Sequence, residues 1–503
     1  MGIVFRQSVK TTIVNFTGAA LGALLVVAST YILSKQGFGF TKNLTVEGSL
    51  LNFVVLLGSS SLAYTFTQRY GPQDKRKKVL ITICAFIPLI TTILLTIPYI
   101  IFRENVVNLY QPADRDFVNT YYMWLPVLVL FWSFMSFLDL YLISQLKVAA
   151  SAFMREVLLR ICNIIILVLY YYRLISFHDF VIATVLIYAI PPFVMLFMAM
   201  RTDNFGLSAQ WNAFTKEEYK EMAHYAWYHL LFGISQNVMG YVDSLMLAPL
   251  DKNGMDSVGV YSVAIYITTL MVIPYRAMTS ATYPILNKAY IENDMAALKD
   301  LFHRSGLNIL IVAVAMLLLI GCNLNAAVGI FPKGYEAVSG LVMILMLGRM
   351  VDMASGLNNE LISISRLYKF NFYVSILLVA LSVIFNRVFI PQYGFYGAAW
   401  SSTLALVIFN VIKIVFLWKK MRILPFTNKS WLVLAAGLIT GLAGYYMPHV
   451  NHFNDTSYTR IFLDVAARSA VIVIVYTTLL LILKPSADLN KYIANIRSDK
   501  RLF

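Results

Sequence analysis

The sequence has few charges and few cysteines for its length. Only 13% of its 503 residues are charged and 59% are hydrophobic, whereas soluble domains carry about 25% charged residues. The three cysteines lie far apart in apolar runs, which leaves neither a disulfide framework nor a Cys-x-x-Cys metal site. These scarcities exclude an ordinary soluble protein and place most of the chain in lipid.

Catalytic and nucleotide-binding patterns are also missing. The sequence contains no Gly-x-x-x-x-Gly-Lys-[Ser/Thr] phosphate loop and no His-Glu-x-x-His pair, and its six histidines are scattered. No nucleophile, base or metal cluster converges at one depth, as an embedded enzyme would require. We therefore expect a protein that is not an enzyme, binds no cofactor other than a coupling ion, and does not use ATP directly.

Long apolar runs are what the sequence has instead. Because a spanning helix needs about 20 residues, fourteen spans would use about 280 residues, close to the hydrophobic share of the chain. The breaks between runs predict an all-α integral membrane protein of about fourteen transmembrane helices. The predicted spans are 11–33, 45–68, 79–101, 119–143, 155–173, 176–200, 223–249, 257–285, 306–331, 335–362, 368–390, 394–418, 431–447 and 460–484.

The basic residues follow membrane sidedness. About 27 of the 40 lysines and arginines fall on the side that holds both termini and about eight on the other, which by the positive-inside rule predicts cytoplasmic termini and a retained first span. This sidedness accounts for the net charge of +15 without a nucleic-acid partner. The connectors 201–222 and 286–305 are predicted as short amphipathic helices at the interface. The first of these connectors carries a capping-box pattern, in which Thr215 is followed three residues later by Glu218.

A weak internal repeat relates the first and seventh spans. Small or polar residues recur at the same spacing with an offset of 218, and six spans separate the two copies. The repeat therefore keeps its membrane orientation and predicts two pseudo-symmetric six-helix lobes with substrate bound between them. The matched residues are Thr11, Asn15, Gly18 and Gly22 in the first span, and His229, Gly233, Gln236 and Gly240 in the seventh.

These observations predict five parts of the chain. They are an N-terminal lobe (1–200), a cytoplasmic connector (201–222), a C-terminal lobe (223–420), two extra transmembrane helices (421–484) and a cytoplasmic tail (485–503).

Ten ionisable residues lie within the predicted spans, where each is costly unless paired, hydrated or able to reach the interface. Arg387 and Lys413 are near span ends and are predicted to snorkel. Asp464 and Arg468 are four residues apart and are predicted to form a structural pair. The remaining six are Asp139, Asp243, Arg276, Arg349, Asp352 and Glu360.

Polar residues form stripes on three predicted helices of the second lobe. The tenth span carries Arg349, Asp352, Gly356, Asn359 and Ser363 at helical spacing, with Glu360 at the edge. Arg349 is too deep to snorkel, so it either binds substrate or pairs with Asp352 as a structural element. The eighth span carries Ser262, Thr269, Arg276, Ser280 and Tyr283, with Pro274 predicted to kink it, and the seventh carries His229, Gln236 and Asp243.

Two segments resemble the polysaccharide-export flippases of the multidrug, oligosaccharidyl-lipid and polysaccharide exporter superfamily. They are Asp243 to Ala264 (DSLMLAPLDKNGMDSVGVYSVA) and Phe385 to Ala399 (FNRVFIPQYGFYGAA). Both are turn and packing patterns, and the proline and glycine of the second suit a tight outer turn. The resemblance implies two six-helix lobes around a cavity lined by the first, second, seventh and eighth helices, plus two C-terminal helices. Basic residues are sparse in the first lobe, which argues against a diphosphate site built equally from both lobes.

The resemblance implies a transporter that flips a polyprenyl-diphosphate-linked oligosaccharide, a precursor of lipopolysaccharide O-antigen, capsule or exopolysaccharide, across a bacterial inner membrane. Other polysaccharide-assembly membrane proteins are then expected partners. One alternative is a cation-coupled multidrug exporter of the same superfamily, and another is a membrane polymerase or ligase. The predicted substrate-binding residues are Arg276, Arg349, Asp243, Asp352, Asn15 and Gln236. The candidates for coupling to protons or sodium are Asp139, Asp243 and Glu360.

Overall fold

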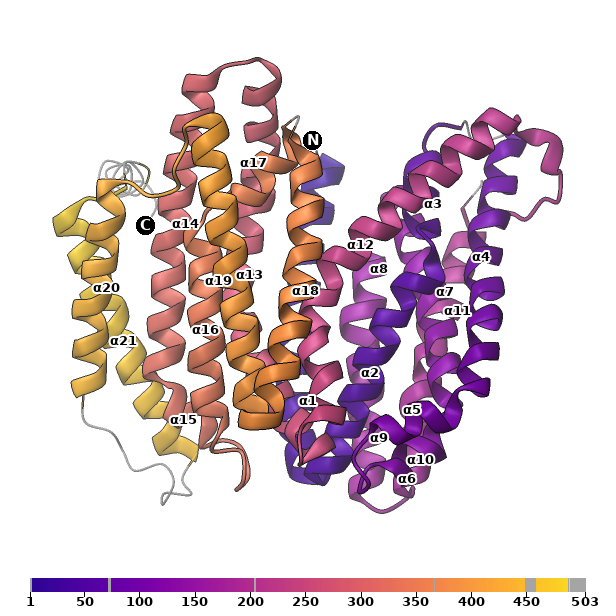
Figure 1. Cartoon of the computed structure of the whole chain (residues 1–503), viewed down its shortest axis with the longest axis horizontal. Helices are drawn as coiled ribbons and strands as arrows, with labels where there is room; N and C mark the ends of the chain where they lie inside the picture. The colour runs from indigo at the N-terminus through magenta and orange to yellow at the C-terminus, as the bar shows by residue number, and fades with distance from the viewer. Residues whose placement is uncertain are drawn as a thin grey trace. The chain divides into compact units, whose positions relative to one another are not determined.

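The structure, a computed structural model, describes residues 2–70, 74–202, 205–365, 367–447, 458–486 and 488. These residues form helices and connecting loops and no strand, which confirms the predicted all-α class (Figure 1). The chain divides into two compact units, Met1–Gly259 and Val260–Phe503. Each unit is described by itself.

Every predicted span coincides with a helix or with a run of consecutive helices. Within the described residues, nine helices are long and apolar enough to cross a membrane, or eleven if each of two bent pairs is one span. The other three predicted spans coincide with the stretch 148–171, with α12 (Lys216–Leu250) and with α20 (Asn428–Tyr446). The first of these carries Arg155, Glu156 and Arg160, so it is less apolar than its neighbours.

The first unit is built around α2, α7 and α12. α2 packs against α4, α7 and α12, and α1 packs against α8, η1 and α9. The elements of this unit, besides the start of α13, are α1 (Gly2–Ile32), α2 (Lys35–Leu56), α3 (Ser59–Phe66), α4 (Lys75–Ile101), α5 (Arg103–Leu109), α6 (Arg115–Tyr121), α7 (Trp124–Ser144), α8 (Val148–Phe153), η1 (Met154–Leu158), α9 (Leu159–Tyr171), α10 (Phe177–Leu186), η2 (Ile187–Ala189), α11 (Ile190–Met200), η3 (Trp211–Ala213) and α12.

The second predicted span is bent by 56° between α2 and α3. Leu57 and Gly58 both adopt positive φ there, at 44° and 77°. A Cβ atom on Gly58 would lie 2.2 Å from the carbonyl oxygen of Ala226 on α12. Glycine therefore permits both the left-handed turn and the close approach of α12.

The second unit is dominated by long helices. The tightest pair is α18 with α19, and α16 packs on α19 and on α14 (Figure 1). Its helices are the remainder of α13 (Gly254–Ile291), then α14 (Met295–Cys322), α15 (Leu324–Val328), α16 (Val338–Ala354), α17 (Asn358–Ile364), α18 (Tyr368–Tyr393), α19 (Phe395–Met421), α20 and α21 (Tyr458–Leu483).

The Ile-Pro-x-Tyr-Gly pattern forms the predicted tight turn between α18 and α19. Gly394 has φ 58° and ψ −136°, a conformation open only to glycine. Three residues later, a Cβ on Gly397 would meet the Phe389 carbonyl oxygen at 2.2 Å. The pattern is therefore explained by backbone geometry and contact between the two helices.

The two C-terminal helices pack on α14 through an apolar cluster that includes Val314, Val433, Ile472 and Tyr476. Arg468 on α21 is 1% exposed. Its guanidinium lies 3.2 Å from a carboxylate oxygen of Asp464, and it donates a hydrogen bond to the Gly444 carbonyl at 2.9 Å. The predicted structural pair is confirmed, and it also joins α21 to α20.

The prediction of separate interfacial helices in the two long connectors is wrong. Among the described residues of the first connector, which leave out 203 and 204, η3 is short, and the capping box of Thr215 and Glu218 forms as predicted but starts the long α12. In the second, α13 continues to Ile291, and α14 begins almost at once, with the Asp294 side chain capping Ala297. Charged residues in these stretches therefore extend membrane helices. The predicted lobe boundaries remain predictions.

Candidate functional site

The tenth predicted span is broken at its centre, so the prediction of one continuous helical stripe is wrong. α16 and α17 meet at an angle of 45°. Gly356 lies at the break with φ 67°, and a Cβ there would approach the Cα of Gly306 on α14 to 3.2 Å. The left-handed glycine ends α16, and backbone and side-chain polar groups gather at the interruption.

Five side chains form what we term the buried polar cluster: Asn410 and Lys413, which are buried, and Asp352, Asn359 and Glu360, which are half-buried. Asn410 donates a hydrogen bond to Asp352 Oδ1 at 3.1 Å, and its own Oδ1 accepts one from Ser355 at 2.9 Å. Lys413 Nζ donates to Asn359 Oδ1. The cluster therefore joins α16, α17 and α19.

Lys413 does not reach the membrane interface, so its predicted snorkelling is wrong. It is 1% exposed, and its ammonium lies 3.7 Å from the centre of the Phe409 ring. It is also within electrostatic range of the Asp352 and Glu360 carboxylates. The reason is that α19 continues to Met421, which places Lys413 two turns inside the helix. Arg387 on α18, the other residue predicted to snorkel, is exposed.

Glu360 has an oxygen available for a ligand. Its Oε2 is buried and accepts no hydrogen bond from any residue that the structure describes. Tyr275 of α13 lies within electrostatic range of Glu360 and donates a hydrogen bond to the Gly356 carbonyl at 3.4 Å. A carboxylate oxygen beside a helix break is a suitable ligand for a proton or a small cation.

Arg276 and Arg349, the two deep arginines of the second unit, form no ion pair with any described residue. Arg349 and Asp352 form no ion pair, so the structural-pair alternative is wrong, and Asp352 is held by Asn410 instead. Arg276 on α13 is exposed, as are Thr269 and Ser280 of its predicted stripe. Arg349 is half-buried on α16. Their role in binding substrate remains a prediction.

The predicted site residues of the first unit differ in their surroundings. Asn15 is exposed on α1, Asp243 is buried on α12, and the Gln236 side chain lies outside the described residues. Asp139 accepts hydrogen bonds from Ser151 and from Arg155, whose Nη1 lies 2.6 Å from Asp139 Oδ2. Asp139 is thus already neutralised by a neighbouring helix segment.

A basic group on α2 and α9 was missed from the sequence. Lys42 lies within electrostatic range of Arg160, which pairs with Glu156 at 3.0 Å. A Cβ on Gly18 of α1 would lie 2.6 Å from Arg160 Nη1, so this glycine admits the guanidinium. The first unit is therefore not as poor in intramembrane basic residues as predicted. The sequence did contain a signal for Lys42, because Ser34 is an N-cap residue. It starts α2 ten residues before the predicted span, so Lys42 lies within the helix.

Comparison with solved structures identifies the fold. The lipid II flippase MurJ in an inward closed conformation is similar with a TM-score of 0.72 at 14% identity, over 94% of this chain and 99% of the flippase. An inward-facing multidrug resistance MATE family transporter of the MOP superfamily is similar with a TM-score of 0.62 at 15% identity, over 82% of this chain and 94% of that one. A MATE multidrug transporter in complex with R6G gives 0.58 at 16% identity, over 85% and 97%. No family model and no curated protein matches the sequence. The chain therefore has the fold of the MOP superfamily transporters.

Proposed function

We propose that the chain is an alternating-access flippase for a polyprenyl-diphosphate-linked oligosaccharide that serves as a surface polysaccharide precursor. The observation that carries this proposal is the extent of the likeness to the lipid II flippase, 94% of this chain against 82% for the MATE transporter. The two C-terminal helices packed on α14 agree with it, since the family resemblance implies such an addition to twelve helices. We place the protein in a bacterial inner membrane with both termini cytoplasmic.

The headgroup of this substrate would be bound by Arg276 and Arg349. A guanidinium offers a planar fork to phosphate or carboxylate oxygens, which the point charge of lysine does not reproduce. Neither arginine forms an ion pair within the described residues, so both can accept a new anionic partner. Asp352, in the same unit, would provide hydrogen bonds to sugar hydroxyls, and the roles of Asp243, Asn15 and Gln236 in binding substrate remain predictions.

Substitution of the two arginines tests this assignment. Arg276→Ala and Arg349→Ala should nearly abolish flipping by protein reconstituted in vesicles, and the Lys variants should retain expression while flipping more slowly. Arg387→Ala is the matched control, because Arg387 is an exposed arginine on a membrane helix of the same unit. Normal flipping by well-expressed alanine variants would contradict the assignment.

Glu360 is our candidate for coupling flipping to a proton or sodium gradient. Of the three candidate carboxylates, Asp139 is paired with Arg155, and Asp243 is buried on α12, whereas Glu360 presents a buried oxygen without a described hydrogen-bond partner. Glu360→Gln should uncouple transport from the gradient, and Asp139→Asn should lower stability more than coupling. Unchanged gradient dependence in Glu360→Gln would contradict this role.

A cation-coupled multidrug exporter is the second candidate, favoured by the likeness to the MATE transporters and by the buried polar cluster. The same vesicles distinguish the two functions. Efflux of a cationic dye that collapses with the ion gradient, without movement of a lipid-linked oligosaccharide, would favour the exporter.

A further inference from the structure

The first unit contains an apolar cavity of about 390 Å³ that the proposed transport does not use. We term it the phenylalanine pocket. It lies between α4, α7, α11 and the loop after α11, and its lining is almost wholly hydrocarbon. The main lining residues are Leu89, Phe131, Phe134, Phe193, Leu196 and Phe205.

The segment 205–208, which contributes Phe205 and Leu207 to the lining of the pocket, is fixed to α4 and α7. The backbone N–H of Ser208 donates a hydrogen bond to Thr82 Oγ1 of α4 at 2.9 Å. The ring of Phe205 packs edge-on against Tyr141 of α7, with their centroids 5.2 Å apart. The pocket wall is therefore held in place by polar and aromatic contacts.

Two basic side chains flank this segment. Lys78 is four residues before Thr82 on the face of α4 that continues to Leu89, and its carbons lie 3.3 Å from the position of a Cβ on Gly206. Arg201 follows Phe193 by two helical turns, and its guanidinium lies 4.2 Å from the centre of the Phe197 ring. Both are exposed, and neither forms an ion pair with any residue that the structure describes.

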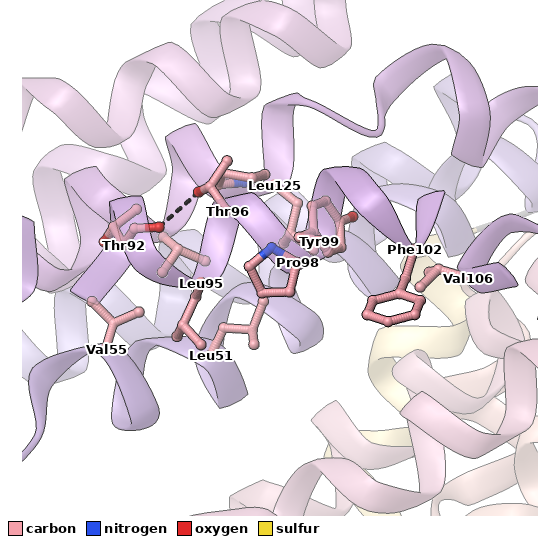
Figure 2. Close-up of a pocket in the computed structure, with 12 residues that line it drawn as sticks. Leu51, Val55, Thr92, Leu95, Thr96, Pro98, Tyr99, Phe102, Val106 and Leu125 are labelled. Carbon is pink, nitrogen blue, oxygen red and sulfur yellow. Dashed lines mark hydrogen bonds between the residues drawn. The ribbon is translucent and has the colours of Figure 1, made fainter. Parts of the chain in front are cut away.

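A second apolar pocket at the opposite end of α4 provides a contrast. It has a volume of about 260 Å³ and is lined by Leu51, Leu95, Pro98 and Phe102 (Figure 2). The nearest arginine in sequence, Arg103, already donates hydrogen bonds to the side chain and backbone of Asn119, at 3.0 and 2.9 Å. Of these two pockets, the phenylalanine pocket is thus the one flanked by two cations that form no ion pair with a described residue.

We propose that the phenylalanine pocket binds an anionic phospholipid of the surrounding membrane. One acyl chain would fill the apolar cavity, and the headgroup phosphate would contact Lys78 and Arg201 at the end of the helices. The long stems of both side chains follow apolar surface and carry their charges to headgroup depth. Under the proposed orientation this is the cytoplasmic leaflet. None of the pocket's residues is among those assigned to the transported substrate.

Lipid retention by the purified full-length protein tests the proposal. Delipidated protein in mild detergent would be titrated with labelled phosphatidylglycerol and, separately, with phosphatidylcholine of the same acyl chains. Lys78→Gln with Arg201→Gln should weaken phosphatidylglycerol binding about thirtyfold, since each basic residue near a membrane surface contributes about 1 kcal/mol. Leu196→Trp should fill the pocket and reduce retention of both lipids. Arg103→Gln, beside the second pocket, is the matched control and should change neither.

Three results would overturn the proposal. The first is equal affinity of the wild type for the two lipids. The second is undiminished phosphatidylglycerol binding by the Lys78→Gln, Arg201→Gln protein, and the third is displacement of phosphatidylglycerol from this site by a polyprenyl phosphate at lower concentration, which would assign the pocket to the transported substrate instead. A folded-state control is provided by the elution profile of each variant on size exclusion.

Discussion

Removal of the Lys413 ammonium should destabilise the second unit strongly. Lys413 is 1% exposed and lies within electrostatic range of two carboxylates, those of Asp352 and Glu360. Lys413→Met preserves most of the side-chain volume but leaves these carboxylates without their buried cation. Lys413 forms no ion pair with a described residue, but its loss also leaves the Asn359 oxygen without its hydrogen-bond donor, and a buried polar group left unsatisfied costs about 1–3 kcal/mol. We therefore expect a loss of this size in the free energy of unfolding.

The reasoning has a direct internal test, because removing a negative charge as well should restore part of the loss. Lys413→Met combined with Glu360→Gln removes one charge of each sign, so the net charge of the cluster is unchanged and Asp352 is still held by Asn410. Arg387→Met is the control, since an exposed side chain should change stability by less than about 0.5 kcal/mol. Denaturant unfolding in detergent micelles, followed by tryptophan fluorescence, measures all four proteins. If Lys413→Met matched Arg387→Met, the buried polar cluster would not be charged as described.

Three further predictions concern topology and the other buried charges. Cysteines introduced at Ser34 and at Asn454, which lies outside the described residues, should be labelled from outside intact cells, and protection of both would reverse the topology. Arg468→Met should lower the free energy of unfolding by about 3–5 kcal/mol, because it removes the buried cation of the pair with Asp464 and its hydrogen bond to the Gly444 carbonyl; an unchanged denaturation midpoint would refute this. Asp243→Asn should lower flipping without removing its gradient dependence, and loss of that dependence would move the coupling role from Glu360 to Asp243.

The helices were predictable because lipid imposes a simple constraint. A spanning segment needs a long apolar run, and positions of such runs can be read directly from the sequence. Turn chemistry was equally readable where glycine was required, as at Gly394. The pair of Asp464 and Arg468 followed from their spacing of one helical turn. Such features depend on residues close together in the chain.

Features that depend on helix ends and breaks were harder to predict. The burial of Lys413 was not predicted because α19 extends beyond its apolar run. Lys42 was not recognised as an intramembrane residue because α2 begins before its apolar run. The stripe on the tenth span was interrupted because Gly356 adopts a positive φ, which a periodic pattern does not reveal. Partners such as Asn410 for Asp352 come from another helix, so no spacing within one span could identify them.

The most direct test of the proposed function is transbilayer movement of a polyprenyl-diphosphate-linked oligosaccharide in vesicles that contain only the purified protein. The proposal predicts that the wild-type protein moves this lipid from one leaflet to the other, and that the Arg276→Ala, Arg349→Ala double variant does so at the rate of empty vesicles while the Arg387→Ala control remains active. Absence of movement by folded wild-type protein with an imposed proton or sodium gradient, together with gradient-dependent efflux of a cationic dye, would contradict the flippase proposal.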